Sequence, residues 1–93
     1  MQIKIDQDEK KGSAKLMDGE IIAAEMTYSV AGPQMIIIDH TEVGEDYRGL
    51  GIGRRVLDAL VEKARKEEFK IMPLCPYARS EFQKDPSIRD VMR

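Results

Sequence analysis

The stretch Arg48-Gly49-Leu50-Gly51-Ile52-Gly53 leads directly into Arg54–Lys66, where apolar residues recur with helical spacing. The first N–H groups of a helix lack internal partners, and the helix dipole adds partial positive charge there. A glycine in a helix lowers its stability by roughly 0.5–1 kcal/mol relative to alanine, so three alternate glycines at this position need a structural or functional reason. We therefore expect a binding site for a phosphate or pyrophosphate at the start of this helix, and we call it the anion seat. The alternative is a turn whose glycines only allow close packing.

The composition indicates one globular domain over residues 1–93, with 42% hydrophobic and 34% charged residues. A net charge of −2 and an aromatic content of 5% argue against a nucleic-acid partner. The single Cys75 excludes an internal disulfide and offers no cysteine cluster for a metal. No apolar run is long enough to cross a membrane, and the N-terminus is unlike a signal peptide. We therefore expect a cytoplasmic protein without a membrane partner.

The residues before the glycines alternate in polarity or are rich in β-branched side chains, which is typical of strands. Three or four strands are expected, from the segments Gln2–Asp6, Ser13–Met17, Glu20–Val30 and Met35–Val43. The dipeptide Asp18-Gly19 predicts a tight turn between the second and third strands. The pattern therefore favours an antiparallel meander.

The residues after the long helix predict a short strand at Lys70–Met72 and a short helix at Tyr77–Lys84. Pro76 can occupy the first turn of that helix. A strand, a loop, a helix and a returning strand form a β-loop-α-β unit, so Met35–Val43 and Lys70–Met72 should be parallel neighbours. The expected fold class is α/β (α+β), with a mixed, mostly antiparallel twisted sheet.

Two nucleotide-binding motifs fail to match the glycine stretch. A Walker A loop needs Gly-Lys-Ser/Thr, but Gly53 is followed by two arginines. A Rossmann fingerprint needs a third glycine where this chain has Arg54 or Val56. Binding of ATP or NAD is therefore disfavoured.

Arg48, Gly51 and Gly53 match the pattern Arg/Gln-x-x-Gly-x-Gly/Ala, which resembles the acyl-CoA signature of the GNAT superfamily of N-acetyltransferases. The stretches His40-Thr41-Glu42-Val43 and Pro73-Leu74-Cys75-Pro76 make nearly the whole chain similar to the small YjdJ-type branch. That branch lacks the N-terminal helices that cover the acceptor side in larger relatives. The resemblance thus implies an acceptor side that is open or is built with a partner, such as a second subunit in a homodimer.

The resemblance implies acetyl-CoA or CoA as the bound cosubstrate, with its pyrophosphate on the glycine turn. We expect CoA to enter an opening that forms where the strand Met35–Val43 and the strand Lys70–Met72 diverge. The residues expected to bind it are Val43, Arg48, Gly49, Leu50, Gly51, Ile52, Gly53, Arg54, Cys75, Tyr77 and Arg79.

Simple alternation places His40 and Glu42 on one face of their strand, about 7 Å apart, together with Ile36 and Ile38. The pair is a candidate acid and base, since a histidine with a reference pKa near ~6.5 suits proton transfer at neutral pH. The alternatives are a histidine hydrogen-bonded to structure and a solvated surface acid.

Cys75 is the third catalytic candidate, as a nucleophile, a thiol near the leaving sulfur, or an inert small hydrophobe. By resemblance, Tyr77 could protonate a leaving thiolate and Arg79 could meet a phosphate. Each of the two could equally be a plain surface residue.

The function expected is acetyl-CoA-dependent acetyl transfer to an amine, which is either a small molecule or a protein. The alternative is a module that binds CoA or acyl-CoA without transfer. Nothing in the sequence identifies the acceptor.

Overall fold

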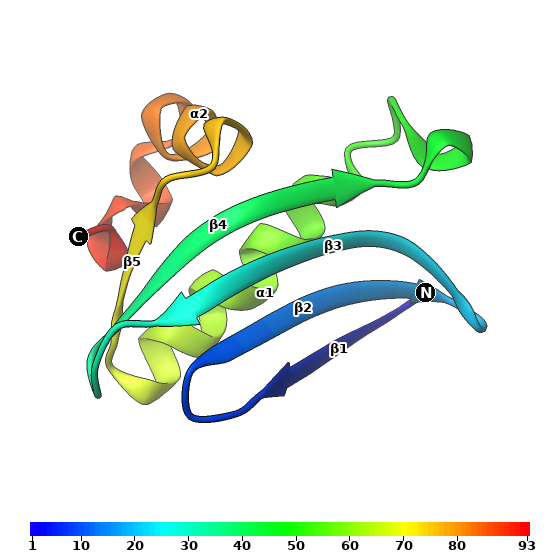
Figure 1. The fold of residues 1–93 in the computed structure, drawn as a ribbon. Coiled ribbons are helices and arrows are strands. Elements are labelled where there is room, and N and C mark those ends of the chain that lie inside the picture. The colour runs from blue at the N-terminus through cyan, green and yellow to red at the C-terminus, as the bar shows by residue number, and fades with distance from the viewer.

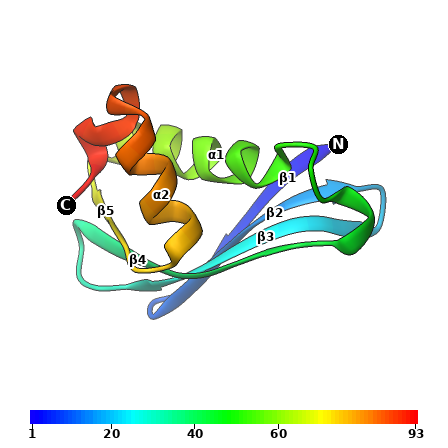
Figure 2. The same ribbon diagram turned by 90° about the horizontal axis from the view of Figure 1, so that it is seen from above.

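The computed structural model describes residues 1–93 as a five-stranded sheet with all its helices on one face (Figures 1 and 2). The strands are β1 (Gln2–Gln7), β2 (Lys11–Asp18), β3 (Ile21–Val30), β4 (Met35–Val43) and β5 (Lys70–Pro73). They lie in chain order; β1 to β4 are antiparallel and β5 is parallel to β4. The expected meander, its mixed sheet and the β-loop-α-β unit are thus confirmed.

Helix α1 (Ile52–Glu67) begins two residues before the predicted start at Arg54. Ile52 lies four residues before Val56, so it extends the apolar stripe that faces the sheet, and it is buried. The helix ends at Glu67, and its C-cap residue Glu68 has a left-handed backbone and donates its N–H to the carbonyl of Ala64.

Helix α2 (Pro76–Lys84) and the 3-10 segment η2 (Pro86–Val91) follow β5. The start of α2 is one residue earlier than predicted, because Pro76 itself is the first helical residue and Cys75 is the N-cap. A third short segment, η1 (Glu45–Tyr47), connects β4 to the glycine turn.

None of the helices is both long and apolar enough to span a bilayer.

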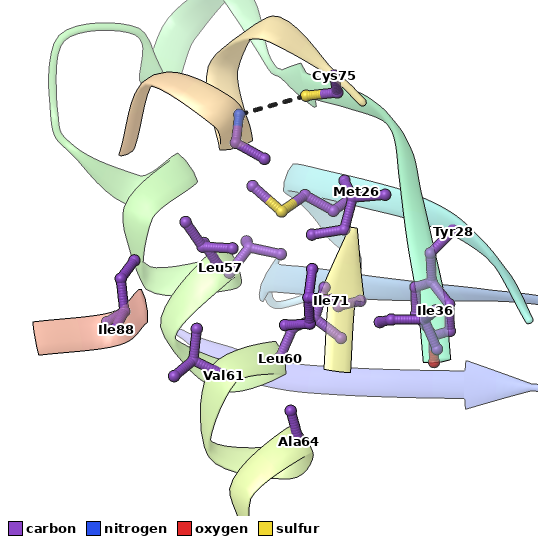
Figure 3. Packing of buried hydrophobic residues seen from close by; sticks show 14 of the residues in the cluster. Met26, Tyr28, Ile36, Leu57, Leu60, Val61, Ala64, Ile71, Cys75 and Ile88 are labelled. Carbon is purple, nitrogen blue, oxygen red and sulfur yellow. Dashed lines mark hydrogen bonds between the residues drawn. The ribbon is translucent and has the colours of Figure 1, made fainter. Parts of the chain in front are cut away.

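One hydrophobic core lies between the sheet and the helices (Figure 3). Its fully buried side chains include Met26 and Ile38 from the sheet, Leu57 and Leu60 from α1, and Phe82 from α2. Because all these elements share one cluster, the helices that frame the glycine turn are fixed to the strands beside it.

A β-bulge in β4 overturns the predicted alternation of faces. Thr27 pairs with His40 and Tyr28 pairs with Ile38, so Asp39 is an extra residue on β4. An extra residue shifts every later side chain to the opposite face. The prediction that His40 shares the face of Ile38 is therefore wrong.

The side chains after the bulge take the reverse of their expected positions. Thr41 lies 2.9 Å from the buried sulfur of Cys75, and Val43 packs against the core. His40 and Glu42 still share a face with each other, but it is the outer face of the sheet, away from the helices. The prediction that His40 and Glu42 share one face of the strand is thus confirmed, although that face is not the one of Ile36 and Ile38.

Strands β4 and β5 pair only from Met35–Lys70 to Ile38–Pro73. The N–H groups of Leu74 and Cys75 both donate to the carbonyl of Ile38, at 3.1 Å each, and the chain then turns into α2. Beyond Ile38, β4 continues without a neighbour on that side. The expected V-shaped opening between these strands is present.

The open edge of β4 presents unpaired backbone groups. The N–H of Gly44 donates to the carbonyl of Ala23 at 2.8 Å. Hydrogen-bonded pairs alternate along an antiparallel ladder, so Glu42 bonds to β3 whereas Thr41 and Val43 direct their N–H groups to the open edge. This edge faces the start of α2.

Candidate functional site

The turn before α1 leaves the mouth of the helix uncovered. Gly51 is the N-cap, with a φ of 71°, and no side chain caps the helix. Gly49 also has a positive φ, of 82°. Both positions favour glycine, since the left-handed region strains other residues. The first N–H groups of α1 are therefore free to bind an anion.

Gly53 serves a different purpose, which is a close approach between α1 and α2. A Cβ atom at this position would lie 3.1 Å from the ring and hydroxyl of Tyr77. Without that atom, the Tyr77 side chain packs directly against the first turn of α1. The packing alternative considered from the sequence therefore applies to Gly53, whereas Gly49 and Gly51 form the exposed turn.

A pocket of about 150 Å³ lies at this helix mouth. It is lined by Val43, Tyr47, Arg48, Gly49, Gly51, Ile52, Gly53 and Tyr77. All of these except Tyr47 are among the residues expected to bind CoA. The pocket extends from the glycine turn to the end of β4 and to α2, so it connects the anion seat with the open strand edge.

Four of the expected CoA-binding residues lie outside the pocket lining, namely Leu50, Arg54, Cys75 and Arg79. Leu50 is 64% exposed at the tip of the turn, and Arg79 is exposed on α2. The guanidinium of Arg54 binds Asp58 at 2.7 Å, together with two carboxylates of α2 and its C-cap. These hydrogen bonds raise the pKa of Arg54, and the bond to Asp58 has the largest effect. Arg54 thus connects α1 to α2, and contact of these four residues with CoA stays a prediction.

Tyr47 is the site residue that sequence reasoning missed. Its hydroxyl donates to Asp18 at 2.7 Å, and that hydrogen bond raises the pKa of Tyr47. The bond ties η1 and the glycine turn to the hairpin between β2 and β3. Only the position of Tyr47 directly before Arg48 could have drawn attention to it, because its partner lies 29 residues away.

His40 and Glu42 form a loose, solvated pair on the outer face. Their Nε2 and Oε2 atoms are 4.0 Å apart, and the side chains are 68% and 76% exposed. Groups with this exposure can exchange protons with water. A role of His40 or Glu42 as the base that accepts the proton of the amine stays a prediction.

Cys75 is 3% exposed and occupies a structural position. Its sulfur accepts the N–H of Ala78 at 3.4 Å, which caps α2 (Figure 3), and it lies 2.9 Å from the hydroxyl oxygen of Thr41. Of the three roles considered from the sequence, this geometry favours the buried small hydrophobe. A catalytic role for Cys75 is not tested by it.

Tyr77 is half-buried between the pocket and α1. Burial, followed by the charge of Glu81, raises the pKa of Tyr77 above its ordinary value near ~10. The phenol therefore keeps its proton at neutral pH, and the group can act as a donor.

No group of three or more His, Cys, Asp or Glu side chains is arranged to hold a metal ion.

Comparison with known proteins assigns this architecture to a family. Residues 13–91 match the family model of the GCN5-related N-acetyl-transferases. The chain belongs to this family. The GNAT resemblance of the sequence is thus confirmed, while the YjdJ-type branch stays a prediction.

Several known proteins are similar to most of the length of this chain. Protein NATD1 of Gallus gallus is 26% identical over 85 residues, which are 90% of this chain and 77% of that protein. The solution structure of a GCN5-like protein from Staphylococcus aureus is 36% identical, with a TM-score of 0.74, and the match covers 97% of this chain and 87% of that one. Ribosomal-protein-alanine N-acetyltransferase from Brucella melitensis is 23% identical with a TM-score of 0.67, over 83% and 62% of the two chains, and shares the fold.

The C-cap of α2 predicts a specific dependence of stability on pH. The side chain of Asp85 accepts hydrogen bonds from Ser87 and from Arg54, which lower the pKa of Asp85 to about 2. This folded-state pKa lies below the unfolded value of about 3.9. The stabilisation is therefore complete above pH ~4 and is lost as pH falls toward 2.

In urea unfolding between pH 2 and 5, Asp85→Asn should flatten the fall in the free energy of unfolding below pH ~4. Asp46→Asn, an exposed carboxylate that accepts no hydrogen bond, should behave like wild type. An unchanged pH slope in Asp85→Asn would contradict this account of the link between α1 and α2.

Proposed function

We propose that this protein transfers an acetyl group from acetyl-CoA to an amine, and that its glycine turn binds the CoA pyrophosphate. One observation carries the proposal. The uncapped start of α1 faces a pocket of about 150 Å³ that continues to Val43, at the open edge of β4. An anion seat and an exposed row of backbone N–H groups therefore adjoin, as a phosphate-bearing acyl donor requires. Membership of the GCN5-related family supports the same function.

The residues at the helix mouth fit a pyrophosphate. A Cβ atom built on Gly49 or Gly51 meets no other atom within 4 Å, so the space in front of the turn is open. The N–H groups of the first turn supply hydrogen bonds, and the helix dipole adds positive potential. The exposed guanidinium of Arg48 lines the same pocket and adds a full positive charge.

When bound, acetyl-CoA supplies a thioester carbonyl carbon that an amine can attack. The N–H groups that Thr41 and Val43 direct to the open edge of β4 can donate to an oxygen that gains negative charge. Glu42 and His40 can accept the proton of the amine, directly or through water. Tyr77 can donate its proton to the leaving sulfur.

We further propose that transfer is direct, with Cys75 in a structural role. Its sulfur is buried, caps α2 and contacts Thr41. A covalent step would require this sulfur to leave the cap. Direct transfer needs no such rearrangement.

A CoA-binding module without transfer is the second candidate. One observation favours it: the His40–Glu42 pair is 4.0 Å apart and largely solvated, which is a weak arrangement for an acid and a base. The two candidates share the CoA seat and differ only in turnover.

The seat is tested by Gly51→Glu and its matched control Gly19→Glu. Both glycines have a positive φ, of 71° and 61°, and both face open space. The two substitutions thus add the same strain and the same charge, but only Gly51 lies at the helix mouth. In isothermal titration with acetyl-CoA, Gly51→Glu should weaken binding by roughly 100-fold or more, since charged hydrogen bonds are lost and like charge is added.

Gly19→Glu should bind acetyl-CoA as wild type does. No binding to wild type at millimolar acetyl-CoA, or equal binding by Gly51→Glu, would refute the proposed seat.

Turnover is tested by following CoA release with a panel of primary amines. Glu42→Gln and Tyr77→Phe should each lower kcat by about 100-fold, the scale of a lost general base or acid. Cys75→Ser should retain most of the activity, because a serine oxygen can also cap α2. Loss of turnover in Cys75→Ser, with folding and acetyl-CoA binding intact, would instead support a covalent step. Binding of acetyl-CoA without turnover of any amine would favour the module.

A further inference from the structure

The outer face of the sheet is left uncovered by the fold. Helices α1 and α2 and the segment η2 all contribute to the single core on the opposite face (Figure 2). The outer face carries the His40–Glu42 pair. An acceptor approaching that pair therefore meets the outer surface of the strands.

A hollow of about 760 Å³ crosses this outer face from β1 to β4. Its volume lies within the range of roughly 300–1,000 Å³ that is usual for small-molecule sites. The polar side chains that line it are Asp6, Gln7, Asp8, Lys11, Ser13, Thr27, Ser29 and Asp39, together with the tyrosine Tyr28. Three carboxylates oppose one ammonium group, so the hollow is net negative and rich in hydrogen-bond acceptors.

The hollow leads to the proposed reaction site. Asp6 pairs with Ser13, Ser13 with Thr27, and Thr27 with His40, so these four residues form one row across four strands. Three strand spacings of about 4.8 Å give the row a length of roughly 14 Å. One end of the row is therefore His40, beside the open edge of β4, and the other end is Asp6.

Carboxylates are held in place at both ends of the hollow. Asp39, the bulge residue next to His40, accepts a hydrogen bond from Ser29 at 2.7 Å. At the far end, Asp8 accepts the N–H groups of Lys10 and Lys11, at 2.8 Å each, which lower the pKa of Asp8. The ammonium group of Lys11 offsets part of the negative charge of the carboxylates at this end. Asp6 beside it keeps the far end attractive to a cation.

We propose that the acceptor is a linear aliphatic polyamine that lies along this hollow. One amino group reaches the open edge of β4, while an ammonium group farther along the molecule sits near Asp6 and Asp8. The inference rests on the proposed acetyl transfer and names its substrate class. The spacing of charge over roughly 14 Å suits a long flexible polycation better than a monoamine.

The reaction at the open edge balances without a further reagent. The amine nitrogen forms a bond to the acetyl carbon, and the bond from that carbon to sulfur breaks. The amine proton passes to Glu42 or His40, and the departing thiolate takes the proton of Tyr77. The products are an N-acetylated polyamine and CoA.

The test compares spermine, ethane-1,2-diamine and butylamine as acceptors, by CoA release and mass spectrometry of the products. We expect kcat/KM to be highest for spermine, since ethane-1,2-diamine is too short to reach both ends of the row. Asp6→Asn and Asp39→Asn should each reduce the preference for spermine over butylamine by about three- to tenfold. High salt should reduce it as well.

Glu20→Gln is the matched control, because it removes one negative charge at the exposed turn between β2 and β3. It should leave the preference for spermine unchanged. Acetyl-CoA binding, measured for each variant, confirms that the fold and the CoA seat are intact.

Equal kcat/KM for spermine and butylamine, or a preference that survives both aspartate substitutions, would overturn the polyamine inference and leave acetyl transfer standing. Turnover of no amine, with acetyl-CoA still bound, would overturn the transfer function and this inference together.

Discussion

The pairing of β4 with β5 stops at Ile38 and Pro73, and the arrangement around the site depends on that interruption. The carbonyl of Ile38 accepts two N–H groups as the chain leaves the sheet for α2. Beyond this point β4 has an open edge, and the bulge at Asp39 sends His40 and Glu42 to the outer face. A fully paired sheet would offer neither the edge nor a passage between the two faces.

The helices hold this opening in a fixed geometry. Gly53 lets Tyr77 pack against the start of α1, and Arg54 binds carboxylates on both helices. Tyr47 secures the other side of the glycine turn to Asp18. The turn is thereby positioned from two directions while its own N–H groups stay uncovered. Because side chains outside the turn hold it in place, this short loop can keep its N–H groups open to an anion even in so small a domain.

Local patterns predicted the elements, whereas long-range pairings decided the details of the site. The bounds of β4 follow from its run of β-branched residues, and the helix from its apolar stripe. The bulge at Asp39 leaves no mark in the sequence, because strand alternation looks intact until the register with Thr27 is known. Arg54 resembled a phosphate ligand because its partners Glu81 and Asp85 are distant in the chain.

The most direct test of the account is an amide chemical-shift titration of the isotope-labelled protein with CoA. We expect the largest shifts at residues 48–54 and at Thr41 and Val43, which carry the N–H groups of the anion seat and of the open strand edge. Shifts confined to the outer face of the sheet, or none at the glycine turn with CoA at saturation, would contradict it.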